Sequence, residues 1–427
     1  MNSIQRIEKL QEQMICRKLD SGLDVFYVPK PGFAEQFAVL TARYGSIDHH
    51  FARGDTGEEI RVPDGIAHFL EHTVFEKESG NISDRFSDLG AYHNAYTSFI
   101  ATAYLFSCAS NFKDHLHTLM DLAFQPYFSA NSVEKEKGII EQEINMYDDM
   151  PQWKVYFNLL QALYHHHPVR INIAGDIASV RSITPDILHT CHDVFYHPGN
   201  MALFVAGNVD LDAMIRQVEV YLDASGYQAR PAPVRLIPQE PACVKESRVE
   251  MQAAVPRPLV YMGFKEGHPA TAPMDLLHRE LANEILLDLL VGRGSALFNR
   301  LYEAGVITGS LDTEYTNYHH FGFTLLGTET DHPDRLVDEV CKEVELMRAS
   351  GFDTQSFDDV RRKIVGNYIQ SFDSLDRLVN ASIGSYHRGY TYLDYDTALR
   401  NVTMDAVWAH LQSHWQPDAF SVSVVRP

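Results

Sequence analysis

The chain has 427 residues, 45% of them hydrophobic, and a formal net charge of −21 at pH 7. This length is too great for one ordinary hydrophobic core and predicts at least two domains. The negative charge argues against binding to nucleic acid or to an anionic membrane surface, because both would repel the chain.

The segment 64–75 is predicted to form a helix that is buried on much of its surface, because apolar side chains recur in it at helical spacing. The helix contains His68, Glu71 and His72 in the order His-x-x-Glu-His. Residues three and four apart are neighbours on a helix. Both imidazoles can therefore reach one metal ion, while Glu71 lies over the same spot.

This arrangement is typical of a zinc hydrolase. Neutral imidazoles suit Zn²⁺, and a catalytic zinc with three protein ligands keeps an open position for a water molecule that Glu71 would deprotonate. The chain has 21 histidines, so a chance match has to be weighed. However, two histidines and an acid in so apolar a helix would cost stability unless they were satisfied, and metal binding satisfies them.

Two strands are predicted next, over 90–98 and 102–106, because aromatic and β-branched residues follow a glycine turn. The first strand contains Asn94, Ala95 and Thr97. On residue type alone, these positions fit any strand of a sheet.

A second polar helix is predicted over 131–146, with Asn131 as its N-terminal cap. Glu136 and Glu143 are seven residues apart, which is two helical turns, so their side chains point the same way. Most glutamates on such a helix face water, and this is our interpretation of Glu134. The segment therefore offers a third ligand for the histidine pair.

A His-x-x-Glu-His helix, followed about seventy residues later by a helix with two glutamates seven apart, resembles the pitrilysin, insulinase and mitochondrial processing peptidase family. By position, the resemblance implies that His68, His72 and Glu143 are zinc ligands. It implies that Glu71 is the general base and that Glu136 is a supporting catalytic glutamate near the site.

The predicted strand over 90–98 also matches this family. There, an Asn-Ala-x-Thr strand is the sheet edge beside the zinc, where an extended substrate pairs through its backbone. The resemblance thus implies that Asn94, Ala95 and Thr97 bind substrate. Because the affinity of such pairing comes from main-chain hydrogen bonds, it depends little on the substrate sequence. The implied activity is that of a zinc metalloendopeptidase that cleaves extended peptides.

An internal duplication is visible in the sequence itself. The segment 183–205 and the segment 402–424 share a threonine, an aspartate, aromatic residues, a proline and an alternating apolar strand at a constant offset of 219 residues. We interpret this as a true repeat, although helix-turn-strand units share generic patterning. Strand-like runs such as 37–43 and 321–327 occur in both halves, so sheets covered by helices are expected.

A proline-rich segment separates the halves and is predicted to be an extended connector. We expect an N-terminal zinc-binding domain over 1–225, a linker over 226–248 and a C-terminal homologous domain over 249–427. The fold class is therefore α+β. The family resemblance agrees, implying two homologous domains of sheet and helix that face a central chamber.

The second half is predicted to lack a metal site. Ser295-x-x-Phe298-x-x-Leu301 echoes a motif that begins at Ser83, and the preceding helix carries no histidine where the first half has its pair. One metal site per chain is therefore expected.

The resemblance also fails at an informative place. In self-sufficient family members, an Arg and a Tyr in the segment after this motif hold the substrate opposite the zinc. Here Tyr302 replaces the Arg and Thr308 stands near the Tyr position. A tyrosine cannot supply the charged, forked donor set of an arginine, and Arg300 lies two positions early. We therefore expect a homologous partner subunit that supplies this clamp and forms a heterodimer.

Two other functions stay open on the sequence. The chain could be a non-catalytic scaffold of the same fold, or a peptide-binding maturation subunit that holds its substrate uncut. The five cysteines are scattered, which suggests reduced and buried thiols. Because no apolar run approaches a bilayer span and the first residues lack a signal-peptide core, a cytoplasmic location is expected.

Overall fold

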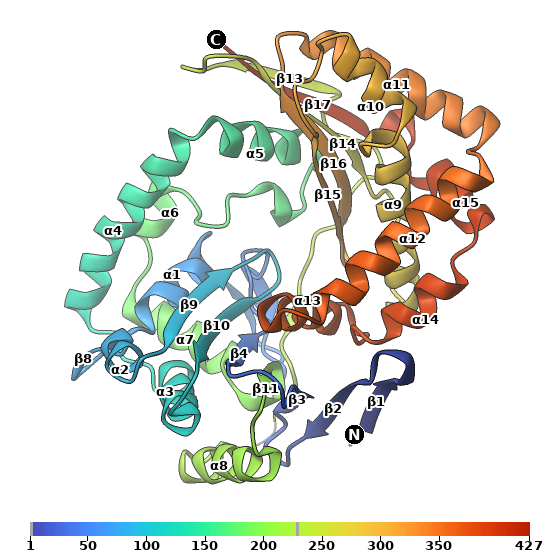
Figure 1. The fold of residues 1–427 in the computed structure, drawn as a ribbon. Helices are drawn as coiled ribbons and strands as arrows, with labels where there is room; N and C mark the ends of the chain where they lie inside the picture. The colour runs from blue at the N-terminus through green and yellow to red at the C-terminus, as the bar shows by residue number, and fades with distance from the viewer. Residues whose placement is uncertain (1–2, 228–229) are drawn as a thin grey trace. The chain divides into compact units, whose positions relative to one another are not determined.

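The computed structural model describes residues 3–227 and 230–427, which form two compact units (Figure 1). Unit 1 comprises Met1–Ile144, Ile171–Leu236 and Ser371–His387, and unit 2 comprises Asn145–Arg170, Ile237–Gln370 and Arg388–Pro427. Each unit has a mixed β-sheet with helices, so the predicted α+β class is confirmed.

The largest sheet of unit 1 has seven strands in the order β1-β2-β3-β11-β4-β10-β9. They are β1 (Ser3–Ile7), β2 (Glu12–Lys18), β3 (Asp24–Pro29), β4 (Gln36–Ala42), β9 (Tyr92–Thr97), β10 (Thr102–Cys108) and β11 (Met201–Gly207). Smaller sheets are formed by β5 (His50–Ala52), β6 (Glu59–Arg61) and β12 (Val234–Arg235), and by β7 (Glu76–Lys77) and β8 (Gly80–Asn81). Strands β3 and β11 are parallel, and the other neighbours are antiparallel.

The helices of unit 1 include the two that sequence analysis singled out. They are α1 (Ile66–Thr73), α2 (Ser83–Asp88), α3 (Phe112–Phe124), α4 (Ala130–Asp148), α6 (Ile177–Arg181), α7 (Pro185–Phe195), α8 (Leu211–Ala224) and α13 (Leu375–Arg388). Helix α1 is buried at nearly every position, as predicted. The predicted cap at Asn131 is wrong, because α4 already begins at Ala130. Instead, the Ser129 hydroxyl accepts a hydrogen bond from the backbone N–H of Ser132 at 3.0 Å.

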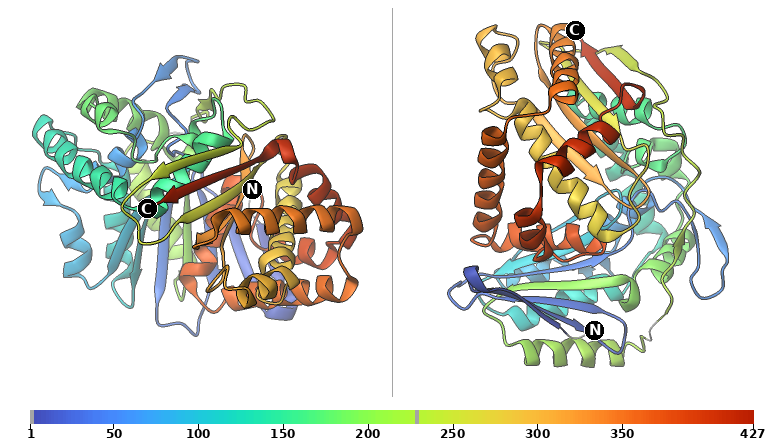
Figure 2. Two further views of the ribbon diagram at one scale, coloured as in Figure 1. Left: turned by 90° about the horizontal axis from the view of Figure 1, so that it is seen from above. Right: turned by 90° about the vertical axis from the view of Figure 1, so that its right-hand side faces the viewer.

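Unit 2 repeats the part of this sheet that runs from β3 to the edge strand β9. Its five strands lie in the order β13-β17-β14-β16-β15, and β13 and β17 are parallel as β3 and β11 are. They are β13 (Arg248–Gln252), β14 (Leu259–Lys265), β15 (Asp312–Asn317), β16 (Gly322–Glu329) and β17 (Phe420–Arg426). The helices are α5 (Pro151–Leu163), α9 (Pro273–Val291), α10 (Ala296–Glu303), α11 (Pro333–Ser350), α12 (Thr354–Ser371), α14 (Asp394–Asn401) and α15 (Met404–His414). The red strand β17 lies between the yellow-green strands β13 and β14 (Figure 2).

The predicted repeat is confirmed residue by residue. Helix α7 and strand β11 recur as α15 and β17, with every bound displaced by 219 residues. Both helices have a threonine cap: Thr184 accepts a hydrogen bond from the backbone N–H of Ile187, and Thr403 accepts one from that of Ala406.

The two units exchange segments, so they differ from the predicted domain boundaries. Helix α5 belongs to unit 2 although it lies in the first half of the sequence, and residues 371–387 belong to unit 1 although they lie in the second. Within unit 1, Tyr386 of α13 makes edge contacts with Phe26 and Phe204 of the sheet, and His387 bonds Thr41 at 3.1 Å. The chain passes from unit 1 to unit 2 between Leu236 and Ile237, inside the proline-rich segment.

The proline-rich segment is anchored at both ends. In unit 1, Arg235 donates two hydrogen bonds to Asp48, whose side chain is fully buried. In unit 2, Glu240 accepts hydrogen bonds from three consecutive backbone N–H groups, those of residues 165–167, and from Lys265. These bonds fix a connector that the sequence predicts only as extended.

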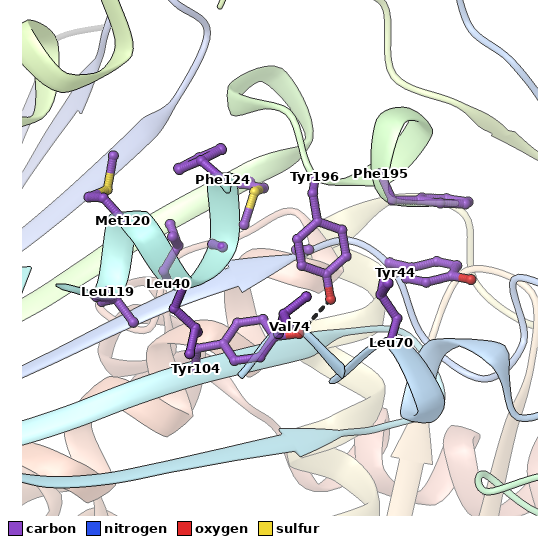
Figure 3. Close-up of a cluster of buried hydrophobic side chains, with 14 of the residues drawn as sticks. Leu40, Tyr44, Leu70, Val74, Tyr104, Leu119, Met120, Phe124, Phe195 and Tyr196 are labelled. Atoms are coloured by element: carbon purple, nitrogen blue, oxygen red, sulfur yellow. Dashed lines mark hydrogen bonds between the residues drawn. The ribbon is translucent and has the colours of Figure 1, made fainter. Parts of the chain in front are cut away.

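An aromatic cluster fills the core beneath α1 (Figure 3). Tyr104 and Tyr196 are both buried and their hydroxyls share a hydrogen bond of 2.7 Å, while Tyr44 stacks on Phe195 at 4.0 Å. Leu70 and Val74 of the α1 region lie in the same cluster, so the core fixes the helix that carries the histidines. The prediction that all the cysteines are buried is wrong, since Cys243 is exposed. None of the described helices combines the length and the apolar character needed to cross a membrane.

The start of α1 depends on a glycine. Gly65 has a φ of +81°, and a Cβ atom added there would lie 2.2 Å from the carbonyl oxygen of Ala174. Only glycine combines this left-handed conformation with so close an approach to backbone. Gly65 thus fixes the direction in which α1 enters the core.

We expect Gly65→Ala to destabilise the fold by more than Gly57→Ala, which serves as a control. Gly57 also has a positive φ, of +74°, but an added Cβ would meet nothing within 4 Å. The control should cost on the order of 1 kcal/mol for backbone strain alone, and Gly65→Ala at least about 2 kcal/mol because it adds a clash with backbone. Denaturant unfolding measures both, and equal costs would contradict the assigned role of Gly65.

Candidate active site

Three side chains from two helices converge beside the sheet of unit 1. His68 and His72 lie one turn apart on α1, with ring centroids separated by 4.6 Å. Glu143 of α4 lies opposite them, with its oxygens 3.7 Å from Nε2 of His68 and 3.5 Å from Nε2 of His72. One ligand atom from each residue falls within 4.8 Å of the others, so this set could hold a metal ion. Two imidazoles and one carboxylate form a donor set that suits zinc.

Glu136 holds one of the histidines in place. Its Oε1 lies 2.9 Å from Nδ1 of His72, and its side chain is 9% exposed. A hydrogen bond donated by Nδ1–H leaves the Nε2 lone pair directed toward Glu143. Metal-binding histidines are commonly oriented by such a carboxylate. Glu136 therefore lies behind the cluster rather than in it.

The two histidines titrate differently. Burial, together with the neighbouring His72, lowers the pKa of His68 to about 4. Burial also acts to lower the pKa of His72, but the hydrogen bond to Glu136 and the nearby carboxylates outweigh it, so this pKa is raised. A proton on His72 occupies the same Nε2 that faces Glu143. Metal binding would therefore release a proton at this position.

Glu71 is the third chemically important residue of α1. Burial raises the pKa of its carboxyl group, and a hydrogen bond of 2.6 Å from the Thr97 hydroxyl partly offsets this effect. A buried carboxylate with a raised pKa, held in one position, is suited to accept and return a proton. Thr97 was predicted to bind substrate, and the structure gives its side chain this further contact with Glu71.

Strand β9 forms one edge of the large sheet and pairs with β10. Of the predicted substrate residues on β9, Asn94 is exposed and Ala95 and Thr97 are partly buried. The Asn94 side chain accepts a hydrogen bond from the backbone N–H of Ala95 at 2.9 Å. Beside this strand lies a pocket of about 410 Å³, whose lining includes Asn94, Ala95, Glu71, His72 and Glu136. The predicted metal, base and substrate residues thus line or adjoin one pocket of unit 1.

The second half of the chain has no histidine at the positions that correspond to His68 and His72. Aligned on Ser83 and Ser295, the positions of His68, Glu71 and His72 fall on Glu280, Asn283 and Glu284 of α9. Tyr302 and Arg300, which sequence analysis singled out, lie on α10. Tyr302 is 56% exposed and stacks on Phe298, and Arg300 is bonded to Glu343 of α11 at 2.5 Å.

Sequence analysis missed a second cluster of possible ligands, which lies in unit 2. Glu266, His410 and His414 are all buried and place one ligand atom each within 4.8 Å of the others. The signal was the spacing of the two histidines, which are four residues apart in a segment that was already predicted to be helical. It was overlooked because the repeated unit in the first half has no histidine pair at these positions.

Comparison with protein families shows two matched regions. Residues 57–177 match the model described as "Insulinase (Peptidase family M16)", and residues 182–364 match the model described as "Peptidase M16 inactive domain". The first region contains the His68 cluster, and the second contains α9, which lacks histidines at the two corresponding positions.

Individual relatives span nearly the whole chain. The "Uncharacterized zinc protease YmfH" of Bacillus subtilis is 40% identical over 423 residues, or 98% of each chain. The structure of a putative M16-like peptidase from Alicyclobacillus acidocaldarius has a TM-score of 0.94 at 37% identity, covering 97% of this chain and 98% of that one. Pitrilysin has the same fold, with a TM-score of 0.76 at 18% identity over 99% of this chain and 46% of its own.

Replacing Glu136 by alanine should weaken zinc binding by roughly 10- to 100-fold, because His72 loses the acceptor that orients its ring. Competition with a chromophoric chelator measures the affinity. Glu134→Ala is the matched control, since Glu134 lies on the same helix but is exposed and paired with Lys137. Equal affinities in the two variants would show that Glu136 does not support the metal site.

Proposed function

Because the chain belongs to the insulinase (M16) family of peptidases, we propose that it is a zinc-dependent endopeptidase of the inverted His-x-x-Glu-His type. The observation that carries the proposal is the convergence of His68, His72 and Glu143 next to the buried Glu71. The donor set fits zinc, and the hydrogen bond of His72 to Glu136 leaves Nε2 available as a ligand.

Each residue has a distinct role in this proposal. His68, His72 and Glu143 would hold a zinc ion, which would polarise the scissile carbonyl and lower the pKa of the attacking water. Glu71 accepts a proton from that water and then returns it to the leaving amine. Thr97 holds the Glu71 carboxylate by its hydrogen bond of 2.6 Å.

The proposed substrate is an extended peptide. Strand β9 is an edge strand beside the pocket of about 410 Å³, so a peptide can add to the sheet there through backbone hydrogen bonds. Asn94, Ala95 and Thr97 lie on this strand and would border the bound peptide. A folded protein cannot offer such a free strand, so unstructured segments are the favoured substrates.

We further propose that the active enzyme is a heterodimer with a homologous subunit. Tyr302 and Thr308 stand where an Arg and a Tyr are expected in self-sufficient members of the family, and Arg300 is already paired with Glu343. A homologous chain that carries both residues would supply the missing clamp. Its own zinc site would not be required.

Glu71→Gln should retain zinc but lower kcat for a quenched unstructured peptide by about 10²- to 10⁴-fold, because the amide cannot accept the proton. Zinc content and peptide cleavage are measured on the same preparation. Glu141→Gln is the control, since Glu141 lies on α4 and pairs with Arg181. A wild-type chain that binds zinc in its active assembly but shows no peptide cleavage that is lost in Glu71→Gln would contradict the peptidase proposal. That result would favour a peptide-binding or scaffold function.

Purified alone, the chain should bind zinc yet cleave the quenched peptide poorly, and addition of the homologous subunit should raise the rate at least tenfold. The expected cause is the arginine and tyrosine clamp, which positions the peptide for attack. The control pairs the homologue with the Glu71→Gln chain, which should stay inactive. High activity of the chain alone would contradict the divided site.

A further inference from the structure

A buried cluster in unit 2 is not used by the proposed peptidase. Glu266 follows strand β14, and His410 and His414 lie one turn apart on α15, with relative exposures of 6%, 7% and 1%. The rings of the two histidines stack at 5.1 Å. Burying three ionisable groups together is costly unless each is paired.

A chain of hydrogen bonds fixes the tautomer of His414. Asn283 Oδ1 accepts hydrogen bonds from Trp415 Nε1 at 2.9 Å and from the Thr324 hydroxyl at 3.0 Å. The only hydroxyl hydrogen of Thr324 is thereby used. His414 Nε2, which lies 2.7 Å from the same hydroxyl oxygen, must then be the donor. In neutral His414 the other ring nitrogen, Nδ1, carries a lone pair and no hydrogen.

That lone pair faces a carboxylate. Nδ1 of His414 lies 3.3 Å from Oε2 of Glu266 and makes no hydrogen bond with any described residue. Oε1 of Glu266 accepts a hydrogen bond from Arg279 at 2.8 Å, while Oε2 accepts only a longer one, of 3.2 Å, from Tyr315. Two electron-rich atoms at this separation repel each other unless a positive species lies near both.

His410 adds a second atom without a hydrogen-bond partner. Its Nε2 is buried and has no hydrogen-bond partner in the described parts of the chain. The buried atoms Nδ1 of His414 and Nε2 of His410 thus both lack a hydrogen-bond partner among the described residues, and a bound cation would satisfy both.

Unit 1 shows that the fold does not need a carboxylate and two imidazoles here. At the 219-residue offset, His410 and His414 correspond to Cys191 and Phe195. In unit 1, strand pairing places Met201 opposite Ala42, and Tyr44 follows Ala42 by two residues. In unit 2, the corresponding Phe420 lies opposite Phe264, and Glu266 follows Phe264 by two residues.

The corresponding set in unit 1 is therefore Tyr44, Cys191 and Phe195, in which Tyr44 stacks on Phe195 (Figure 3). An aromatic packing serves at this position of the repeat, whereas unit 2 replaces it with three ligands.

We propose that Glu266, His410 and His414 bind a second zinc ion, in a closed structural site within unit 2. The set contains two imidazoles, at positions i and i+4 of one helix, and one carboxylate at the end of a neighbouring strand. Such nitrogen and oxygen ligands suit zinc. Arg279 binds the oxygen of Glu266 that faces away from the histidines, so Oε2 is left for the metal. The site stabilises the packing of α15 on β14.

The test uses the full chain carrying His68→Ala and His72→Ala, which removes the first cluster. The chain is loaded with Zn²⁺, washed with a chelator to strip exposed ions, and analysed for zinc by atomic emission. We expect about one zinc per chain and an unfolding temperature that rises on zinc loading. Adding His414→Phe, the residue that unit 1 has at this position, should reduce the zinc content at least tenfold, and His410→Ala should do the same.

His115→Phe in the same background is the matched control. His115 is also fully buried, but it belongs to no group of three possible ligands among the described residues. This variant should keep its zinc. The absence of zinc from the folded His68→Ala/His72→Ala chain would overturn the proposal, as would full zinc content in the His414→Phe variant. Either result leaves the peptidase proposal unaffected. If neither the His414→Phe nor the His410→Ala variant folds, the zinc content of the His68→Ala/His72→Ala chain alone decides the proposal.

Discussion

The structure of unit 1 depends on the burial of polar side chains in the apolar helix α1. His68 and Glu71 lie among residues that are almost entirely removed from water, and an unsatisfied polar group there would cost several kcal/mol. Helix α4 and strand β9 relieve this cost by placing Glu143 against His68, Glu136 against His72 and Thr97 against Glu71. The same contacts that make the burial tolerable also orient the side chains for metal binding and proton transfer.

The internal repeat separates what the fold requires from what the chemistry requires. Both units keep the order and direction of five strands and the capped helix before the last of them. Yet Glu280, Asn283 and Glu284 stand where unit 1 has its histidines and base, and ligand-type residues appear in unit 2 where unit 1 has an aromatic core. The shared fold thus tolerates a cluster of possible metal ligands at two different places. Among the described residues, one cluster occurs only in unit 1, and the other occurs only in unit 2.

The ligand helix and the internal repeat could be predicted from the sequence, because both follow from the spacing of residues along the chain. Helical periodicity placed His68, Glu71 and His72 on one face, and the constant offset revealed the repeat to the residue. Contacts set by tertiary packing could not be predicted. The hydrogen bond of Thr97 to Glu71 joins residues 26 apart in the chain. The cap at Ser129, two residues before the predicted cap at Asn131, was missed because serine and asparagine both favour capping positions.

The exchange of segments between the units has a consequence for how the chain can be divided. Residues 145–170 complete unit 2 and residues 371–387 complete unit 1, although each lies in the opposite half of the sequence. Cutting the chain at the proline-rich connector would therefore yield two fragments, neither of which contains all of its own unit. The two halves of the sequence are therefore not separable modules.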